Sequence, residues 1–246
     1  MKYFVTVFLI LYMLTSYIIS DNQKLLEQAS YHYKNSQFEE ALSLYETLHD
    51  KFPNNIDLIF NLGNTHFKLN NLGFAIGYYL KAIKWEPSNS ELRYNLSLTR
   101  NLIKQTIEPS DSILYSLLGW LRFLSINTAF NIMMILLLIG LVTLRLIYLK
   151  KFNRELLTNM LIICGISLVL SFSIFIHRYI DYSQEKGVVV TKKQAVYSGP
   201  SENLSVLFYI HEGYEFKINK SAGNWVELEL SNGFKGWAPL SSLFLI

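Results

Sequence analysis

Two uncharged stretches decide the fold: residues 123–144 read FLSINTAFNIMMILLLIGLVTL, and residues 156–176 read LLTNMLIICGISLVLSFSIFI. A helix of the first length is about 33 Å long at ~1.5 Å per residue, and the hydrocarbon core of a bilayer is about 30 Å thick. Core helices of soluble domains are shorter and carry charges. We therefore expect two membrane-spanning helices, over 123–149 and 156–177.

The charges around these stretches predict which side of the membrane each end occupies. The connecting segment 145–155 carries four basic residues and one acid, Glu155. The basic residues are Arg145, Lys150, Lys151 and Arg154. The positive-inside rule places such a loop in the cytoplasm. Residues 21–122 and 177–246 then share the opposite, extracytoplasmic side.

A third uncharged stretch, residues 3–20, follows Lys2 at the N-terminus. This pattern is typical of an export signal. Ser20 is small enough for a cleavage site, but Ile18 is large and branched. A cleaved signal peptide over 1–20 and an uncleaved signal anchor therefore both stay open. Either one delivers the chain from residue 21 onward across the membrane, in agreement with the basic loop.

The composition excludes several classes of protein. The chain is 51% hydrophobic and 17% charged, with a mean hydropathy of +0.22, whereas soluble domains carry about 25% charged residues. This excludes a disordered chain. The net charge of +3 comes from segments beside the apolar stretches, which does not fit a nucleic-acid-binding surface. The single cysteine, Cys164, excludes a disulfide framework, and we expect it to be a small buried side chain.

Residues 24–55 resemble residues 58–89 at a shift of 34 positions. The shift aligns His32 with His66, Lys34 with Lys68, Ala41 with Ala75, Tyr45 with Tyr79, Pro53 with Pro87 and Asn55 with Asn89. This period, and the stretch LGNTHFKLNNLGFAIGYYLKAIKWEP at 62–87, resemble the tetratricopeptide repeat (TPR). The resemblance implies an α-helical solenoid over 21–105, with close helix crossings at Gly63, Ala75 and Ala82.

The resemblance also implies a concave face that binds an extended peptide. The residues placed on it are Tyr33, Phe60, Asn64, Phe67, Tyr94 and Asn95. Alternatively, these aromatic side chains pack on a neighbouring helix such as 113–123, within a linker or interfacial segment over 106–122. His32 and His66 are interpreted as packed helix residues rather than ligands.

From residue 187 the hydrophobic period changes to that of strands. The runs GVVVT, QAVYS, VLFYI, YEFKIN and WVELEL are separated by turn signals such as Gly199-Pro200 and Asn232-Gly233. Trp225, Glu227 and Glu229 alternate with apolar residues, which predicts a strand with one buried face. Five short strands over 187–246 predict a small closed barrel.

This segment resembles a bacterial SH3-like domain through SGPSEN, HEGYEFKI and GNWVELELSNGFKGWAPLSSL. Gly213, Gly233 and Gly236 fit positions that need a positive φ or a close backbone approach. Relatives often recognise cell-wall peptides or proline-containing segments, and the implied contacts here are Tyr197, Trp225 and Trp237. The alternative is that the tryptophans fill the core, and for Trp225 the core position is favoured because so small a domain has few other large side chains.

No enzyme is expected. The sequence has no glycine-rich phosphate loop, no G-x-S-x-G turn and no H-E-x-x-H motif. Glu227 and Glu229 are expected on a solvated strand face, where a carboxylate pair has no reason to be tuned for catalysis. We expect no cofactor and no metal site.

The order of the segments defines a mixed multidomain membrane protein: export signal, repeats, membrane hairpin, SH3-like barrel. This order resembles the BatE-like proteins of the Bacteroides aerotolerance (Bat) family over essentially the whole chain. The resemblance implies an envelope protein that works beside von Willebrand factor A-type Bat membrane proteins and a MoxR-type ATPase, with a link to oxidative-stress tolerance. The leading hypothesis is a non-enzymatic scaffold. The alternatives are a peptidoglycan-associated regulator of a cell-wall hydrolase and a subunit needed only for assembly of a membrane complex.

Overall fold

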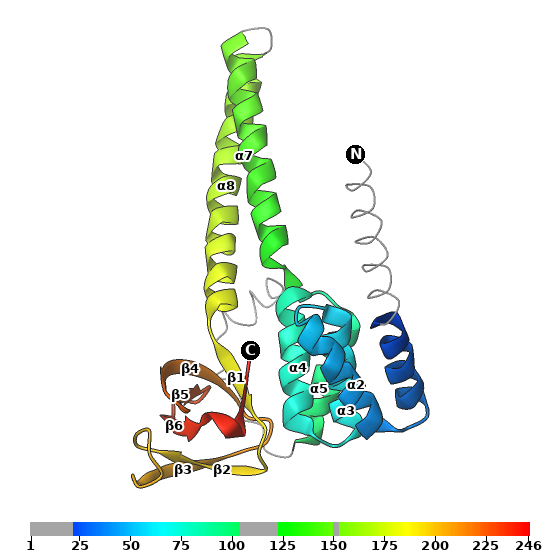
Figure 1. Ribbon diagram of the computed structural model, residues 1–246. Helices are drawn as coiled ribbons and strands as arrows, with labels where there is room; N and C mark the ends of the chain where they lie inside the picture. The colour runs from blue at the N-terminus through cyan, green and yellow to red at the C-terminus, as the bar shows by residue number, and fades with distance from the viewer. Residues whose placement is uncertain (1–21, 104–122, 150–152) are drawn as a thin grey trace, which may run out of the picture.

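The helices that precede the long apolar hairpin recur at a spacing of 34 residues. The computed structural model describes residues 22–103, 123–149 and 153–246 (Figure 1). A helix over 22–34 is followed by α2 (Phe38–Lys51), α3 (Ile56–Lys68), α4 (Leu72–Trp85) and α5 (Ser90–Leu102). Helices α3, α4 and α5 each begin 34 residues after an equivalent helix. The turns repeat too, since Ser36 and Asn70 have φ of 62° and 58°.

Small residues allow these helices to approach closely. A Cβ atom on Gly63 would lie 2.7 Å from Cε1 of Tyr79, so a larger residue there would push α3 away from α4. Ala75 and Ala82 have no exposed surface, and Ala82 belongs to the same buried cluster as Leu92 of α5. The small residues therefore lie at the helix crossings that the sequence predicts.

The two long helices, α7 (Ile126–Leu149) and α8 (Arg154–Ser183), form an antiparallel hairpin that projects from the rest of the chain (Figure 1). Both are long and apolar enough to cross a membrane, by length and composition. Cys164 is buried against α7, with Sγ 3.1 Å from the carbonyl oxygen of Leu136, as predicted for a small buried side chain.

The helices of the hairpin extend beyond the two uncharged stretches. Arg145 lies inside α7 rather than in the connecting loop, because apolar residues continue the helix to Leu149. Helix α8 runs past residue 177 to Ser183 and so includes Arg178, whose side chain is buried against the start of α7 by a bond from Nε to the carbonyl of Leu124 (2.9 Å). The predicted signal segment 1–20, the whole linker 106–122 and residues 150–152 lie outside the described residues.

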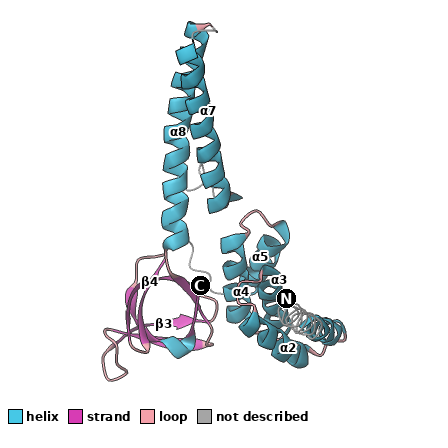
Figure 2. Ribbon diagram, turned by 45° about the horizontal axis from the view of Figure 1, so that its top comes forward, coloured by secondary structure: helices cyan, strands magenta, loops and turns pink. Residues whose placement is uncertain are grey.

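The C-terminal part is an antiparallel sheet that curls into a ring when viewed end-on (Figure 2). Its strands are β1 (Lys186–Val189), β2 (Lys193–Tyr197), β3 (Val206–His211), β4 (Glu215–Ala222), β5 (Trp225–Leu230), β6 (Lys235–Pro239) and β7 (Leu243–Leu245), with a short 3-10 helix, η2 (Leu240–Ser242), before β7. The strand order is β3-β2-β6-β5-β4-β1-β7.

Seven strands form where the sequence analysis predicts five. The predicted runs correspond to β1 to β5, and β6 and β7 are additional. Strand β6 contains Gly236 and Pro239 and β7 has three residues, so neither shows a recognisable alternating run. Both are held by partners distant in sequence: β6 pairs with β5 and β2, and β7 pairs with β1.

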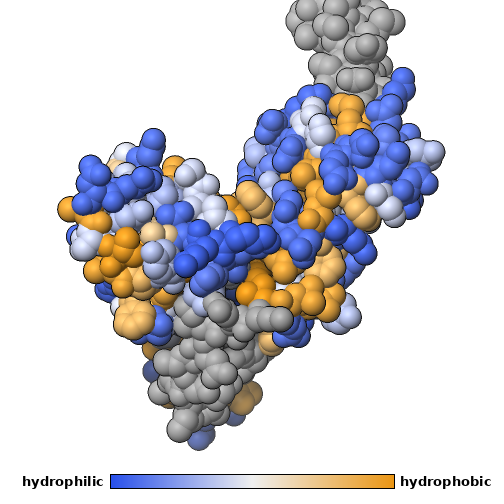
Figure 3. Space-filling model, turned by 90° about the horizontal axis from the view of Figure 1, so that it is seen from below, coloured by the Kyte–Doolittle hydropathy of each residue, from blue (hydrophilic) through white to orange (hydrophobic). Residues whose placement is uncertain are grey.

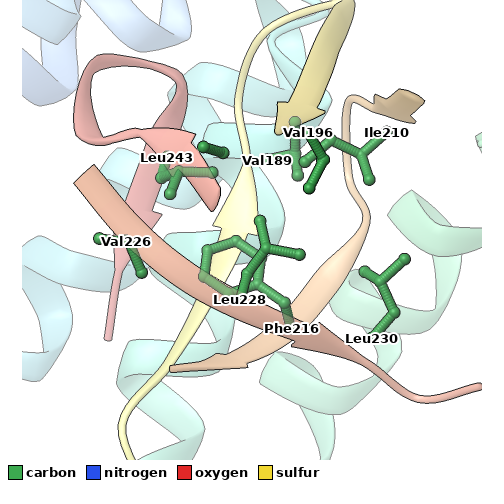
Figure 4. Close-up of a cluster of buried hydrophobic side chains, with 9 residues drawn as sticks. Val189, Val196, Ile210, Phe216, Val226, Leu228, Leu230 and Leu243 are labelled. Atoms are coloured by element: carbon green, nitrogen blue, oxygen red, sulfur yellow. The ribbon is translucent and has the colours of Figure 1, made fainter. Parts of the chain in front are cut away.

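The core of the sheet is aliphatic with one phenylalanine (Figure 4). Val226, Leu228 and Leu230 point inward from β5 and are buried, while Trp225, Glu227 and Glu229 are half-buried on the other face. The predicted alternation of β5 is confirmed. Gly213 and Gly233 have φ of 82° and 86°, and a Cβ atom on Gly236 would lie 2.5 Å from Val196 Cγ1, so the three predicted glycine positions are also confirmed.

Helix α4 packs directly against strands β1 and β7, although the hairpin lies between them in sequence. We call this contact the seam. Val188 of β1 has no exposed surface and belongs to the buried cluster of the helices, with Ile76 and Tyr79. A Cβ atom on Gly73 would lie 2.4 Å from the carbonyl oxygen of Val189, and one on Gly77 would lie 2.5 Å from Cδ1 of Phe244. The seam is therefore packed as closely as a domain interior.

Polar contacts also cross the seam. The N–H of Gly73, in the first turn of α4, donates to Oε1 of Glu212 at 3.0 Å. Glu212 thus caps a helix whose own N-cap residue, Asn71, makes no side-chain cap bond. Glu212 also pairs with Lys192. Arg100 of α5 donates to both carboxylate oxygens of Glu215, at 2.7 and 2.8 Å, and hydrophilic residues cross the junction on the face seen in Figure 3.

His66 lies in an aromatic stack that reaches the seam. Its ring lies 4.9 Å from that of Phe74 and 5.3 Å from that of Tyr78, nearly parallel to both, and Tyr78 contacts Phe244 of β7 at 4.8 Å. His66 is 5% exposed, and Nδ1 has no hydrogen-bond partner among the described residues. Burial lowers its pKa from 6.5 to about 4, so the ring is neutral at pH 7. It is a packed helix residue, as predicted.

We predict that Gly73→Ala forces α4 away from β1, because the added carbon meets the backbone of Val189 and Val190. The expected loss in free energy of unfolding is about 1–3 kcal/mol, typical of overpacking. The measurement is urea denaturation of the detergent-solubilised chain. The matched control is Gly165→Ala, whose added carbon meets nothing within 4 Å. Equal stability of the two variants would contradict a tight seam.

We predict a second effect, on pH dependence. Between pH 6.5 and about 4 the unfolded chain binds a proton at His66 that the folded chain does not, so the free energy of unfolding falls as the pH is lowered through this range. The loss reaches about 3 kcal/mol near the lower limit. His66→Phe keeps the stack and removes the titration, so the variant loses less stability on acidification in urea denaturation. Identical pH profiles would show that His66 is not the group responsible.

Candidate functional site

Two residues predicted for a concave face, Asn64 and Asn95, form a hydrogen-bonded triad with Tyr79. The hydroxyl of Tyr79 donates to Oδ1 of Asn64 at 2.7 Å, and Nδ2 of Asn95 donates to the same oxygen at 3.0 Å. Tyr79 is 1% exposed, and its pKa is raised strongly, first by burial and then by Tyr33 and Glu91. The triad joins α3, α4 and α5. Among the residues that the structure describes, the amide nitrogen of Asn64 and the amide oxygen of Asn95 make no hydrogen bond.

The aromatic residues predicted for this face divide into two groups. Phe60 and Phe67 of α3 are half-buried against the helical core, and Tyr33 packs against the neighbouring cluster with its ring 5.5 Å from that of Phe38. Tyr94 is 67% exposed and is adjacent to Asn95 on α5. Asn64 and Asn95 are hydrogen-bonded to each other and half-buried, as are Phe60, Phe67 and Tyr33, and Tyr94 is the one exposed residue of the six.

In the alternative, a helix over 113–123 covers this face. Phe123 is the one residue of this segment that the structure describes. The ring of Phe123 lies 4.1 Å from the guanidinium of Arg93 on α5 and is 49% exposed. Phe123 thus contacts the residue directly before Tyr94 on α5, and the Tyr94 side chain stays exposed.

The predicted aromatic residues of the sheet lie together on its outer face. Tyr197 pairs with Trp237 across β2 and β6, and its ring contacts that of Trp225 edge-to-face at 5.6 Å. Glu227 is opposite Trp237, and Lys220 is opposite Glu227. We call Tyr197, Trp225 and Trp237 the aromatic face. Its three side chains are half-buried, which leaves ring surface and polar edges accessible.

The preference for Trp225 as a core residue is wrong. Trp225 is on the side of β5 opposite Val226, Leu228 and Leu230, outside the buried cluster. Phe216 supplies the large core side chain from β4, with Phe208, Tyr214 and Ile218 packed around the cluster. The core is filled without a tryptophan.

Glu229, on the outer face of β5, contacts Lys235 and Asn219. Hydrogen bonds from Lys235 and then Asn219 lower the pKa of Glu229, so this carboxylate stays ionised at neutral pH. Within residues 22–103, 123–149 and 153–246, no group of three His, Cys, Asp or Glu side chains could hold a metal ion.

Residues 190–243 match the family model described as the bacterial SH3 domain. The match spans β2 to β6 and reaches the first residue of β7, and it includes the whole aromatic face. The C-terminal sheet is therefore a bacterial SH3 domain, a class that in general binds proteins or cell wall. A comparison with curated proteins found no match to the chain.

Sequence reasoning missed the residues that join the SH3 domain to the helices. Gly73 and Gly77 are spaced four apart on α4, a pattern that indicates close approach to a helix face and was available in the sequence. Glu212, Arg100 and Glu215 carried no such signal. Their pairing spans more than 110 residues and depends on how the hairpin returns the chain.

Proposed function

We propose that this chain is a non-enzymatic scaffold anchored in a bacterial inner membrane by α7 and α8, with its helices and its SH3 domain together on the extracytoplasmic side. The observation that carries the proposal is the seam. Val188 and Glu212 follow the hairpin, yet they complete the core and the helix cap of a domain that precedes it. A chain that crosses a membrane can form this contact only if it returns to the side from which it came.

The helical part acts in this proposal as a set of TPR repeats that holds a partner protein. The equal helix spacing and the small residues at the crossings support the assignment. The amide nitrogen of Asn64 and the amide oxygen of Asn95 would pair with the backbone of an extended segment, and Tyr94 would pack against its side chains. By resemblance, the partner is a von Willebrand factor A-type Bat membrane protein, with a MoxR-type ATPase in the same system and a role in aerotolerance.

The aromatic face of the SH3 domain provides a second binding surface, for another protein or for cell wall. Because the seam fixes this domain against α4, both surfaces are held in one orientation above the membrane. Partners bound to the two surfaces would be concentrated near one another without making new contacts.

The test of the first surface is capture of a von Willebrand factor A-type membrane protein by the full-length, detergent-solubilised chain. We expect Tyr94→Ala to weaken capture by roughly tenfold, as for an exposed aromatic residue at the centre of an interface. Tyr31→Ala is the matched control, since Tyr31 is 65% exposed on a helix outside the triad.

Asn64→Ala is a poor test, because it removes the acceptor of the buried Tyr79 hydroxyl and destabilises the fold. The proposal fails at this surface if Tyr94→Ala and Tyr31→Ala capture the partner equally well.

The second candidate function is a peptidoglycan-associated regulator of a cell-wall hydrolase. It is favoured by the SH3 match, because bacterial SH3 domains often bind peptidoglycan, and by the aromatic face within the matched residues. We predict that the full chain sediments with isolated cell wall and that Trp237→Ala abolishes this. Phe234→Ala, a 59% exposed aromatic residue of the same domain outside the aromatic face, retains it. An unmodified chain that stays in the supernatant removes this candidate.

A further inference from the structure

Two large apolar side chains are exposed at the same end of the helical part. Trp85 is the last residue of α4 and is 44% exposed, and Phe52 directly follows α2 and is also 44% exposed. Helices α2 and α4 are equivalent in the 34-residue repeat, so both side chains lie at the end of the domain where these helices finish.

This end contacts both ends of the hairpin. The ring of Trp85 lies 6.1 Å from that of Tyr182 near the end of α8, and Nζ of Lys84 lies 5.0 Å from the same ring. Arg93 stacks on Phe123, three residues before α7. Figure 1 shows α7 beginning directly beside this end of α4 and α5.

The level of Trp85 relative to the apolar helices follows from the helix rise. Charged side chains lie where the two ends of the hairpin meet the rest of the chain. Arg178 donates to the carbonyl of Leu124 and to Asp181, and Lys186 donates to Asp181. We call Arg178, Asp181 and Lys186 the charged layer. Tyr182 is one turn beyond Arg178, or about 6 Å along the axis. The headgroup layer of a bilayer is about 5–8 Å thick on each side. If the charged layer marks the hydrocarbon boundary, Trp85 and Tyr182 lie within the headgroup layer.

The chemistry of this surface fits that layer. Tryptophan and tyrosine rings are amphipathic and concentrate at the headgroup level, and lysine and arginine extend their charged ends toward it. Exposed single apolar residues are common on soluble domains. Here, however, Phe52 and Trp85 lie at the same end of the helical part as two aromatic rings that stack with basic side chains. These rings belong to Phe123, just before α7, and to Tyr182, near the end of α8.

We propose that this end of the helical part binds the phospholipid headgroup layer, so that the domain lies on the bilayer instead of being held away from it. The contact residues are Phe52, Lys84, Trp85, Arg93, Phe123 and Tyr182. The inference rests on the proposed function, because it requires α7 and α8 to cross the membrane. It adds a lipid surface as a binding partner of the helical part itself.

The experiment is tryptophan quenching by brominated phosphatidylcholine in vesicles that contain the full chain. Replacing Trp120, Trp225 and Trp237 by Phe leaves Trp85 as the single tryptophan. In a variant that also lacks Trp85, Phe172→Trp on α8 is the control for a residue inside the bilayer. Tyr31→Trp is the control for a residue in water. The helix over 22–34 begins at the end of the helical part that faces the membrane, because Asn22 accepts a hydrogen bond from Lys51 at the end of α2. Tyr31 is nine residues further along this helix, or about 13 Å from Asn22 along its axis.

We expect strong quenching of Phe172→Trp, none of Tyr31→Trp, and intermediate quenching of Trp85. Quenching of Phe172→Trp without quenching of Trp85 would overturn the lipid contact. It would leave the membrane hairpin intact and indicate that Trp85 contacts a protein partner or water. Absence of quenching in Phe172→Trp would overturn the membrane hairpin and, with it, this inference. Circular dichroism of each variant establishes that it is folded before quenching is compared.

Discussion

The seam between α4 and strands β1 and β7 constrains the rest of the structure. Its two sides come from opposite ends of a hairpin of apolar helices, and they share one buried cluster in which Val188 completes the helical core. Glu212 satisfies a helix N–H that the local sequence leaves without a side-chain cap. These contacts cannot form across a bilayer. Where α7 and α8 span a membrane, the two folded parts therefore lie on one side of it, together with both ends of the hairpin.

Because of this constraint, the proposed scaffold would hold its two binding surfaces in a fixed relative orientation. A flexible chain with two binding domains would present its surfaces in many relative orientations, whereas the packing of Gly73 and Gly77 against the sheet fixes the helices and the SH3 domain as a unit. The Asn64 triad and the aromatic face are then two fixed surfaces on one support. The charged layer around Arg178 and the ring contacts of Trp85 and Arg93 join the same unit to the hairpin.

Much of this architecture could be predicted from the sequence, because it depends on local period. The 34-residue shift predicted helices whose observed bounds repeat at that shift, the uncharged stretches predicted the hairpin, and alternation predicted β5. The predictions that failed depended on distant partners. Strands β6 and β7 are defined by β5 and β1 rather than by their own sequence, and Trp225 is on the outer face because Phe216 from another strand fills the core. Asn64 and Asn95, both predicted for the same face, are hydrogen-bonded to each other, but the bond from the buried Tyr79 to Asn64 was not foreseen.

The most direct test of the account is the sidedness of the chain in intact spheroplasts. A single cysteine replaces Glu27, Glu202 or Lys151 in a Cys164→Ala background. Each variant is treated with a membrane-impermeant maleimide before and after lysis. Glu27 lies on the surface of the helical part and Glu202 on the surface of the SH3 domain. The account predicts labelling of Glu27→Cys and Glu202→Cys before lysis and of Lys151→Cys only afterwards. Labelling of Glu27→Cys and Glu202→Cys on opposite sides of the membrane would contradict it.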